Sequence, residues 1–149
     1  MPILYTIGFT KKKAKEFFET LIAYKVDTVI DIRLNNTSQL AGFSKYPDID
    51  FFLDKLCNIK YIHDTNFAPT NETLESYKKN IINWEEYVSR FTKTMDERKI
   101  HDYIKGKYDS TSNKTVCLLC SEIKADKCHR KLVAQYFSEI FNGIKIINI

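Results

Sequence analysis

The sequence predicts an α/β fold: a single three-layer domain with a central, mostly parallel sheet of about five strands and helices on both faces. Short apolar runs alternate with segments whose apolar residues recur at helical spacing. No hairpin turn signal joins neighbouring runs, so helical crossovers are expected to link parallel strands. No repeat, low-complexity tract or Pro- and Gly-rich linker divides the chain, and residues 1–149 are expected to form one α/β domain.

The first half of the chain predicts three strands and two helices. Residues 3–7 form a short apolar run, read as a buried strand, that ends at Gly8. Apolar residues at 14, 17, 18, 21 and 22 follow at helical spacing, with Thr10 as the expected N-cap. A second strand is predicted over 27–32, a short helix over about 50–56 and a third strand around 59–63.

The second half predicts further helices and two more strands. One helix lies near 72–79, and another follows Asn83, whose N-cap role is supported by Glu86 three residues later. Residues 106–114 are polar and predict a loop. The continuous apolar run 116–120 is typical of a strand buried on both faces. An amphipathic helix up to about residue 141 and a last strand over 144–147 complete the chain.

Composition excludes some classes of protein. The chain has 44% hydrophobic residues and a net charge of +4, which by itself does not select nucleic acid as a partner. No segment approaches the roughly 18 apolar residues of a membrane span. The first residues lack the pattern of a signal peptide, so a cytoplasmic location is expected. The four cysteines are therefore expected to be reduced thiols without disulfides.

Charged residues follow the predicted strands at one edge of the sheet. Right-handed crossovers bring the carboxyl ends of parallel strands together, and ligands of such folds bind at that edge. Gly8, Arg33 and Cys120 stand at these ends, and lysines at 11–13, 124, 127 and 131 accompany Arg130 near predicted helix starts. Cations beside free helix N–H groups favour an anion site. The alternative is that these lysines only face water.

The segment 120–130 is the densest group of reactive side chains. With Asp126 as the expected cap, Cys128 falls in the first helical turn, where a thiolate is stabilised. His129 is expected to point inward as an acid, a base or a structural link, and Arg130 to be freer to reach a ligand. The alternative, which the residue type favours, is that Cys128 is a small buried apolar residue. Glu122 is either a general base or an ion-pair partner of an arginine.

No metal site and no cofactor are predicted. Cys117, Cys120, Cys128 and His129 are four candidate zinc ligands, but the period of two in a strand sends Cys117 and Cys120 to opposite faces. Cys117 and Cys57 are therefore assigned to the core. No glycine-rich loop of Walker or dinucleotide type is present, nor is a cysteine-phosphatase loop or a nucleophile elbow.

Three elements of the sequence form a recognisable set. They are Thr6-Ile7-Gly8, Asp31-Ile32-Arg33 with Ser38 and Phe43 downstream, and Cys120-x-Glu122-x5-Cys128-His129-Arg130. Together they resemble a known family, the one catalogued as domain of unknown function 488, although Phe9 stands where many members have histidine. The resemblance covers nearly the whole chain and implies an α/β sandwich with a shared pocket, but no assigned reaction.

Three functional hypotheses follow. In the first, the protein binds an anionic small molecule, phosphorylated or nucleotide-like, and is an enzyme if Glu122, Cys128 or His129 acts on it. Arg33 and Arg130 would hold the anion, with Ser38 as a hydrogen-bond donor and Gly8 and Cys120 beside it. The second is a nucleic-acid-binding module with a basic edge and exposed aromatics such as Tyr46 and Phe43. In the third, the Cys-His-Arg turn only joins helix to sheet.

Overall fold

The computed structural model describes residues 2–37, 41–121 and 127–149. Within these residues, five parallel strands form one sheet in the order β3-β2-β4-β1-β5. This confirms the predicted α/β fold with a parallel sheet. The strands are β1 (Ile3–Gly8), β2 (Thr28–Asp31), β3 (Lys60–His63), β4 (Val116–Cys120) and β5 (Lys145–Asn148).

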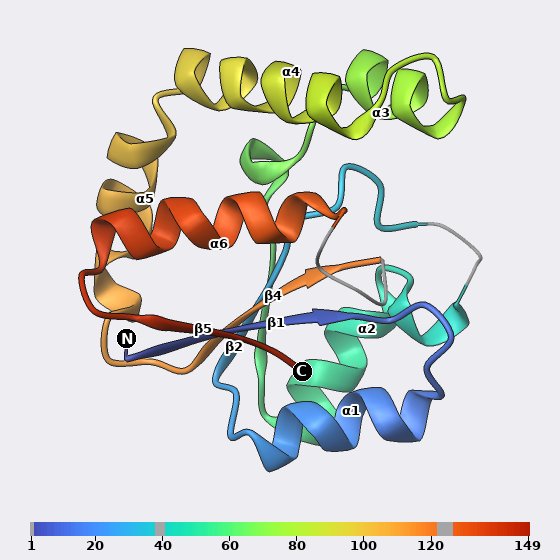
Figure 1. Ribbon diagram of the computed structural model, residues 1–149. Coiled ribbons are helices and arrows are strands. Elements are labelled where there is room, and N and C mark those ends of the chain that lie inside the picture. The colour runs from blue at the N-terminus through green and yellow to red at the C-terminus, as the bar shows by residue number, and fades with distance from the viewer. Residues whose placement is uncertain (1, 38–40, 122–126) are drawn as a thin grey trace.

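Helices cover both faces of the sheet, which makes three layers (Figure 1). One face carries α1 (Ala14–Ala23) and α2 (Asp48–Phe51), which continues as a π-helical segment (Phe52–Leu56). The other face carries α6 (His129–Ile140) and α5 (Ile100–Tyr108), and the pair α3 (Asn71–Lys78) and α4 (Trp84–Glu97) lies beyond α6. Three 3₁₀ turns lie at Gly42–Ser44, Thr65–Phe67 and Asp109–Thr111.

Strand β4 lies at the centre of the sheet. Its residue Leu118 is paired with Thr6 of β1 on one side and with Ile30 of β2 on the other. All five residues of β4 are buried, as the continuous apolar run predicts. Strands β1, β4 and β2 are therefore adjacent and parallel.

Alternation along β4 separates two hydrophobic cores. Leu118 and Cys120 contribute to the core beneath α4, α5 and α6, whereas Cys117 and Leu119 contribute to the core beneath α1 and α2. The prediction that Cys117 and Cys120 face opposite sides is thus confirmed. Cys57 is only partly buried and packs at the margin of the second core.

Two local predictions are wrong. Helix α1 begins at Ala14 after Lys13, and Thr10 instead donates its hydroxyl to the Ser121 carbonyl at 2.6 Å, which joins two loops at the carboxyl edge. Part of the predicted loop 106–114 is helical, because α5 extends to Tyr108. Tyr108 is buried against Phe67 and Phe137, and this burial outweighs the polar composition of the segment.

The start of α6 also differs from expectation. The helix begins at His129, and Cys128 occupies the N-cap position with extended backbone angles, so Cys128 precedes the first turn. The expected cap Asp126 lies outside the described residues.

Among the helices that the structure describes, none is both long and apolar enough to cross a membrane.

Candidate functional site

A cavity of about 430 Å³ lies at the carboxyl edge of the sheet, where the sequence predicts a site. The ends of β2 and β4 supply one side of it, and the start of α6 meets them there. Helices α3 and α4 supply the opposite side. Its lining within the described residues is Phe9, Arg33, Leu34, Asn35, Pro69, Leu74, Tyr77, Lys78, Asn80, Trp84, Tyr87, Cys120, Ser121, Lys127, Cys128 and His129.

Arg33 lines this cavity and forms a buried ion pair with Asp31. Its guanidinium donates to both carboxylate oxygens of Asp31, at 2.9 and 2.7 Å, and to the carbonyl of Ser44 at 2.7 Å. Arg33 is 5% exposed and Asp31 is fully buried. Burial alone would lower the pKa of Arg33, but the bond and the charge of Asp31 outweigh it and raise that pKa. The guanidinium is therefore a permanent cation.

One donor of Arg33 is not used within the described protein. Its Nη1 atom is buried and has no hydrogen-bond partner among the residues described. The ring of Phe9 lies over the guanidinium, with its centroid 4.9 Å from Cζ. Phe9 thus contributes an aromatic face to a cation.

Two histidines hold the chain that leaves β2. The Nε2 atom of His129 lies 2.7 Å from the carbonyl oxygen of Ile32, and that of His63 lies 2.8 Å from the carbonyl oxygen of Arg33. A carbonyl only accepts, so each Nε2 carries the hydrogen. In neutral His129, this leaves the lone pair of Nδ1 free to accept or to bind a metal.

A sulfur–imidazole cluster forms beside Arg33. The Sγ atom of Cys120 lies 3.6 Å from Nδ1 of His129, and Cys128 donates a hydrogen bond to Cys120. All three side chains are at least 93% buried, with exposures of 4%, 4% and 7%. The register of the sheet places Gly8 beside Cys120.

The pKa values of the two thiols in this cluster are shifted in opposite directions. The hydrogen bond from Cys128 lowers the pKa of Cys120 below the usual thiol value despite burial. The same bond, together with burial, raises the pKa of Cys128. These directions favour Cys120 over Cys128 as the thiolate and agree with the alternative that Cys128 is a small buried residue; the role of Cys128 stays a prediction.

Aromatic side chains form the facing wall. Trp84 and Tyr87 of α4 stack with ring centroids 5.1 Å apart, and Tyr77 of α3 packs on Tyr87 at 4.9 Å. The sequence predicts the helix after Asn83 that carries Trp84 and Tyr87, but it does not place these two residues at the site. Along the sequence, α5 lies between α4 and β4, and the spacing of apolar residues in α4 gives no sign of a cavity.

The remaining predicted site residues have different placements. Gly8 and Arg130 lie outside the set of described residues that line the cavity. Arg130 is 1% exposed and the largest fully buried side chain among those described, so the expectation that it is the freer residue is wrong. Ser38 and Glu122 lie outside the described residues, and their roles stay predictions.

Replacing Arg130 by alanine is expected to lower the free energy of unfolding by about 2 kcal/mol, because a buried side chain at the helix–sheet junction is lost. Urea denaturation measures the change. Lys131→Ala is the control, since that neighbouring cation is exposed and is expected to change the free energy by less than about 0.5 kcal/mol. Equal stability of the Arg130→Ala variant and the parent protein would contradict a structural role.

A second buried polar cluster lies beyond the end of β3. Asp64 accepts hydrogen bonds from Tyr103 at 2.8 Å, from Lys107 at 3.0 Å and from Tyr108 at 2.5 Å. Burial alone would raise the pKa of Asp64, but these bonds and one from Asn66 outweigh it, and the pKa lies below the ordinary value. The cluster attaches α5 to the sheet.

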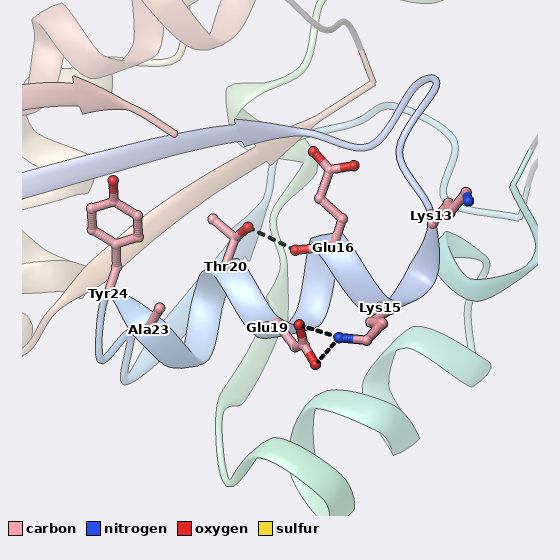
Figure 2. A pocket seen from close by; sticks show the side chains of 7 residues that line it. All are labelled: Lys13, Lys15, Glu16, Glu19, Thr20, Ala23 and Tyr24. Atoms are coloured by element: carbon pink, nitrogen blue, oxygen red, sulfur yellow. Dashed lines mark hydrogen bonds and ion pairs between the residues drawn. The ribbon is translucent and has the colours of Figure 1, made fainter.

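A different hollow, of about 440 Å³, lies along the outer side of α1 (Figure 2). Lys15 and Glu19, which line it, form an exposed ion pair at 2.7 Å. Thr20 donates to the carbonyl of Glu16. These polar groups are paired with each other or with the helix backbone, and the hollow is away from the strand ends.

The parallel sheet between helical layers and the cavity at its carboxyl edge define the class: an α/β domain with an edge site made from Arg33, Cys120, Cys128 and His129. The family model described as Domain of unknown function DUF488 matches residues 13–137. The chain belongs to this family, and the resemblance found in the sequence is confirmed. No curated protein and no solved structure matched the chain.

Proposed function

We propose that the protein binds an anionic small molecule with a planar ring, of the nucleotide-like class, in the cavity at the carboxyl edge. The observation that carries this proposal is the pairing of an aromatic wall with cations around one cavity. Tyr77 and Trp84 are partly exposed aromatic rings of this wall, with Tyr87 buried behind them, and Lys78 and Lys127 are exposed lysines among the lining residues. A volume of about 430 Å³ suits a small ligand.

The polar groups of the opposite wall support the same ligand class. The Nη1 atom of Arg33 is buried without a partner among the described residues, which is energetically unfavourable, and a small shift of the side chains over it on ligand binding would let a ligand oxygen accept from it. Because Asp31 already neutralises Arg33, the lysines supply the excess positive charge. The anion is therefore held by Lys78 and Lys127 with Arg33 as a directed donor, and Arg130 supports the site from within the core.

The Cys120 sulfur is the group that would act on a bound ligand. It lies in the cavity wall, its pKa is lowered, and Cys128 and His129 contact it. A thiolate is the nucleophilic form of cysteine.

Ligand binding is expected to change the fluorescence of Trp84, which is the only tryptophan of the chain and lines the cavity. Titration with a nucleoside monophosphate should give a saturable change. The corresponding nucleoside and inorganic phosphate should each bind more weakly. The nucleoside lacks the contacts of the phosphate with the lysines, and inorganic phosphate lacks the contacts of the ring with the aromatic wall. Lys78→Ala and Lys127→Ala should each weaken nucleotide binding about 10-fold, the equivalent of one charge-assisted hydrogen bond.

Lys79→Ala is the matched control, because Lys79 is exposed beside Lys78 but lies outside the lining. No fluorescence change with any of the three probes would overturn the proposal. Binding of a single-stranded oligonucleotide with a steep loss of affinity on adding salt would favour the nucleic-acid hypothesis instead. For that hypothesis, Tyr46 is exposed as expected, whereas Phe43 packs on Phe17 and is not.

A further inference from the structure

Three potential metal ligands converge at the base of the cavity. The Sγ atoms of Cys120 and Cys128 and a ring nitrogen of His129 all lie within 4.8 Å of one another. Cys120 ends β4, whereas Cys128 and His129 stand at the start of α6. Two elements that are fixed by the core therefore present the three atoms to one point.

The distance between one sulfur and the imidazole nitrogen fits tetrahedral zinc, and the other pairs lie within 4.8 Å. With Zn–S near 2.3 Å and Zn–N near 2.05 Å, tetrahedral angles place sulfur and nitrogen about 3.6 Å apart and two sulfurs about 3.8 Å apart. The Cys120 Sγ to His129 Nδ1 distance is 3.6 Å. No large rearrangement is needed for these two atoms to share an ion.

The orientation of His129 is that of a metal ligand. Its Nε2–H donates to the carbonyl of Ile32 at 2.7 Å, which leaves the lone pair of Nδ1 directed at Cys120. Metal-bound histidines generally donate their other ring N–H to a carbonyl or carboxylate, and this bond fixes tautomer and ring orientation.

Charge also favours a divalent ion at this position. A divalent ion with two thiolates is neutral overall, which suits a site whose ligands are nine-tenths buried. Cys128 is the N-cap of the 12-residue helix α6, and a metal ion that coordinates its sulfur displaces the thiol proton.

We propose that Cys120, Cys128 and His129 bind one Zn²⁺, with the fourth coordination position open to the cavity. All three ligands line that cavity, and among the described residues the ligand group has three members. Three protein ligands with one open position are the pattern of catalytic rather than structural zinc sites. Such an ion polarises a bound water or a ligand oxygen beside the aromatic wall.

This proposal departs from the sequence-based prediction of no metal. That prediction rested on a four-ligand site that included Cys117, and Cys117 does lie in the opposite core. The three-ligand site does not need Cys117. Its test does not use the nucleotide-like ligand proposed above. A Zn²⁺ ion on Cys120 would, however, take the place of that sulfur as the group that acts on such a ligand.

The test is titration of the reduced, chelator-treated full-length protein with Co²⁺ under anaerobic conditions. We expect one Co²⁺ per chain, with tetrahedral d–d bands and a thiolate-to-cobalt charge-transfer band, and displacement of both by one equivalent of Zn²⁺. Cys120→Ser and Cys128→Ser should each remove about half of the charge-transfer intensity and weaken binding at least ~10-fold. Circular dichroism confirms that each variant is folded.

Cys57→Ser and Cys117→Ala are the controls and should leave the spectrum unchanged, since neither sulfur belongs to the cluster. A folded parent protein that shows only the weak spectrum of octahedral Co²⁺ would overturn the proposal without any variant. An undiminished charge-transfer band in the Cys120→Ser/Cys128→Ser double variant would also overturn it.

Discussion

Replacing Arg33 by alanine is expected to lower the free energy of unfolding by about 4 kcal/mol, a large part of the stability of a domain this size. The loss arises because Asp31 is fully buried and accepts two hydrogen bonds from this guanidinium. Without Arg33, a buried carboxylate keeps only the Tyr61 hydroxyl at 2.5 Å and the Arg33 backbone N–H at 3.2 Å as donors among the described contacts. Urea denaturation monitored by circular dichroism measures the change.

The matched control is Arg90→Ala, which removes a similar contact from the surface. Arg90 pairs with Glu86 at 2.9 Å on the exposed side of α4, and its loss should cost less than about 0.5 kcal/mol. Adding Asp31→Asn to Arg33→Ala should recover part of the lost stability, because it removes the uncompensated charge. Similar losses for Arg33→Ala and Arg90→Ala would show that the Asp31–Arg33 pair does not stabilise the edge.

Replacing Asp64 by alanine is expected to cost about 3 kcal/mol, since it leaves the buried hydroxyl of Tyr108 without its acceptor and removes the partner of Lys107. Denaturation at neutral pH measures this loss. The exposed neighbour of the cluster, Asp102, provides a control, and Asp102→Asn should change stability by less than about 0.5 kcal/mol.

The same carboxylate predicts a dependence of stability on pH. The pKa of Asp64 is lowered in the folded protein, so its contribution is complete above the unfolded value and is lost as pH falls toward the folded one. The free energy of unfolding should therefore decrease below about pH 4. In the Asp64→Asn variant this decrease should be smaller. The same decrease at low pH in the variant and the parent protein would contradict the role given to Asp64.

Much of the fold was predictable because it depends on the local pattern of apolar, polar and helix-capping residues. The apolar run Val116–Cys120 indicated a strand buried on both faces, and Asn83 does accept from the Glu86 N–H at 2.8 Å as the N-cap of α4. Helix α5 was missed because its polar residues resemble a loop. Its helical state depends on the burial of Ile104 and Tyr108 against distant segments, which no local window contains.

The candidate site was predictable only in position. Parallel topology by itself brings Arg33, Cys120, Cys128 and His129 to one edge, and these four do line the cavity. Sequence could not show that Arg33 is paired with Asp31, that Arg130 is buried, or that α3 and α4 supply the aromatic wall.

The sequence by itself thus determined the alternation of strands and helices, the edge where the cavity lies and the separation of Cys117 from Cys120, since each follows from backbone periodicity and the handedness of crossovers. Only the tertiary structure decided which thiol has the lowered pKa and which nitrogen of His129 faces the sulfur of Cys120. Those properties depend on single contacts between Cys120, His129 and Ile32, residues up to 97 positions apart, whose distances no periodicity encodes.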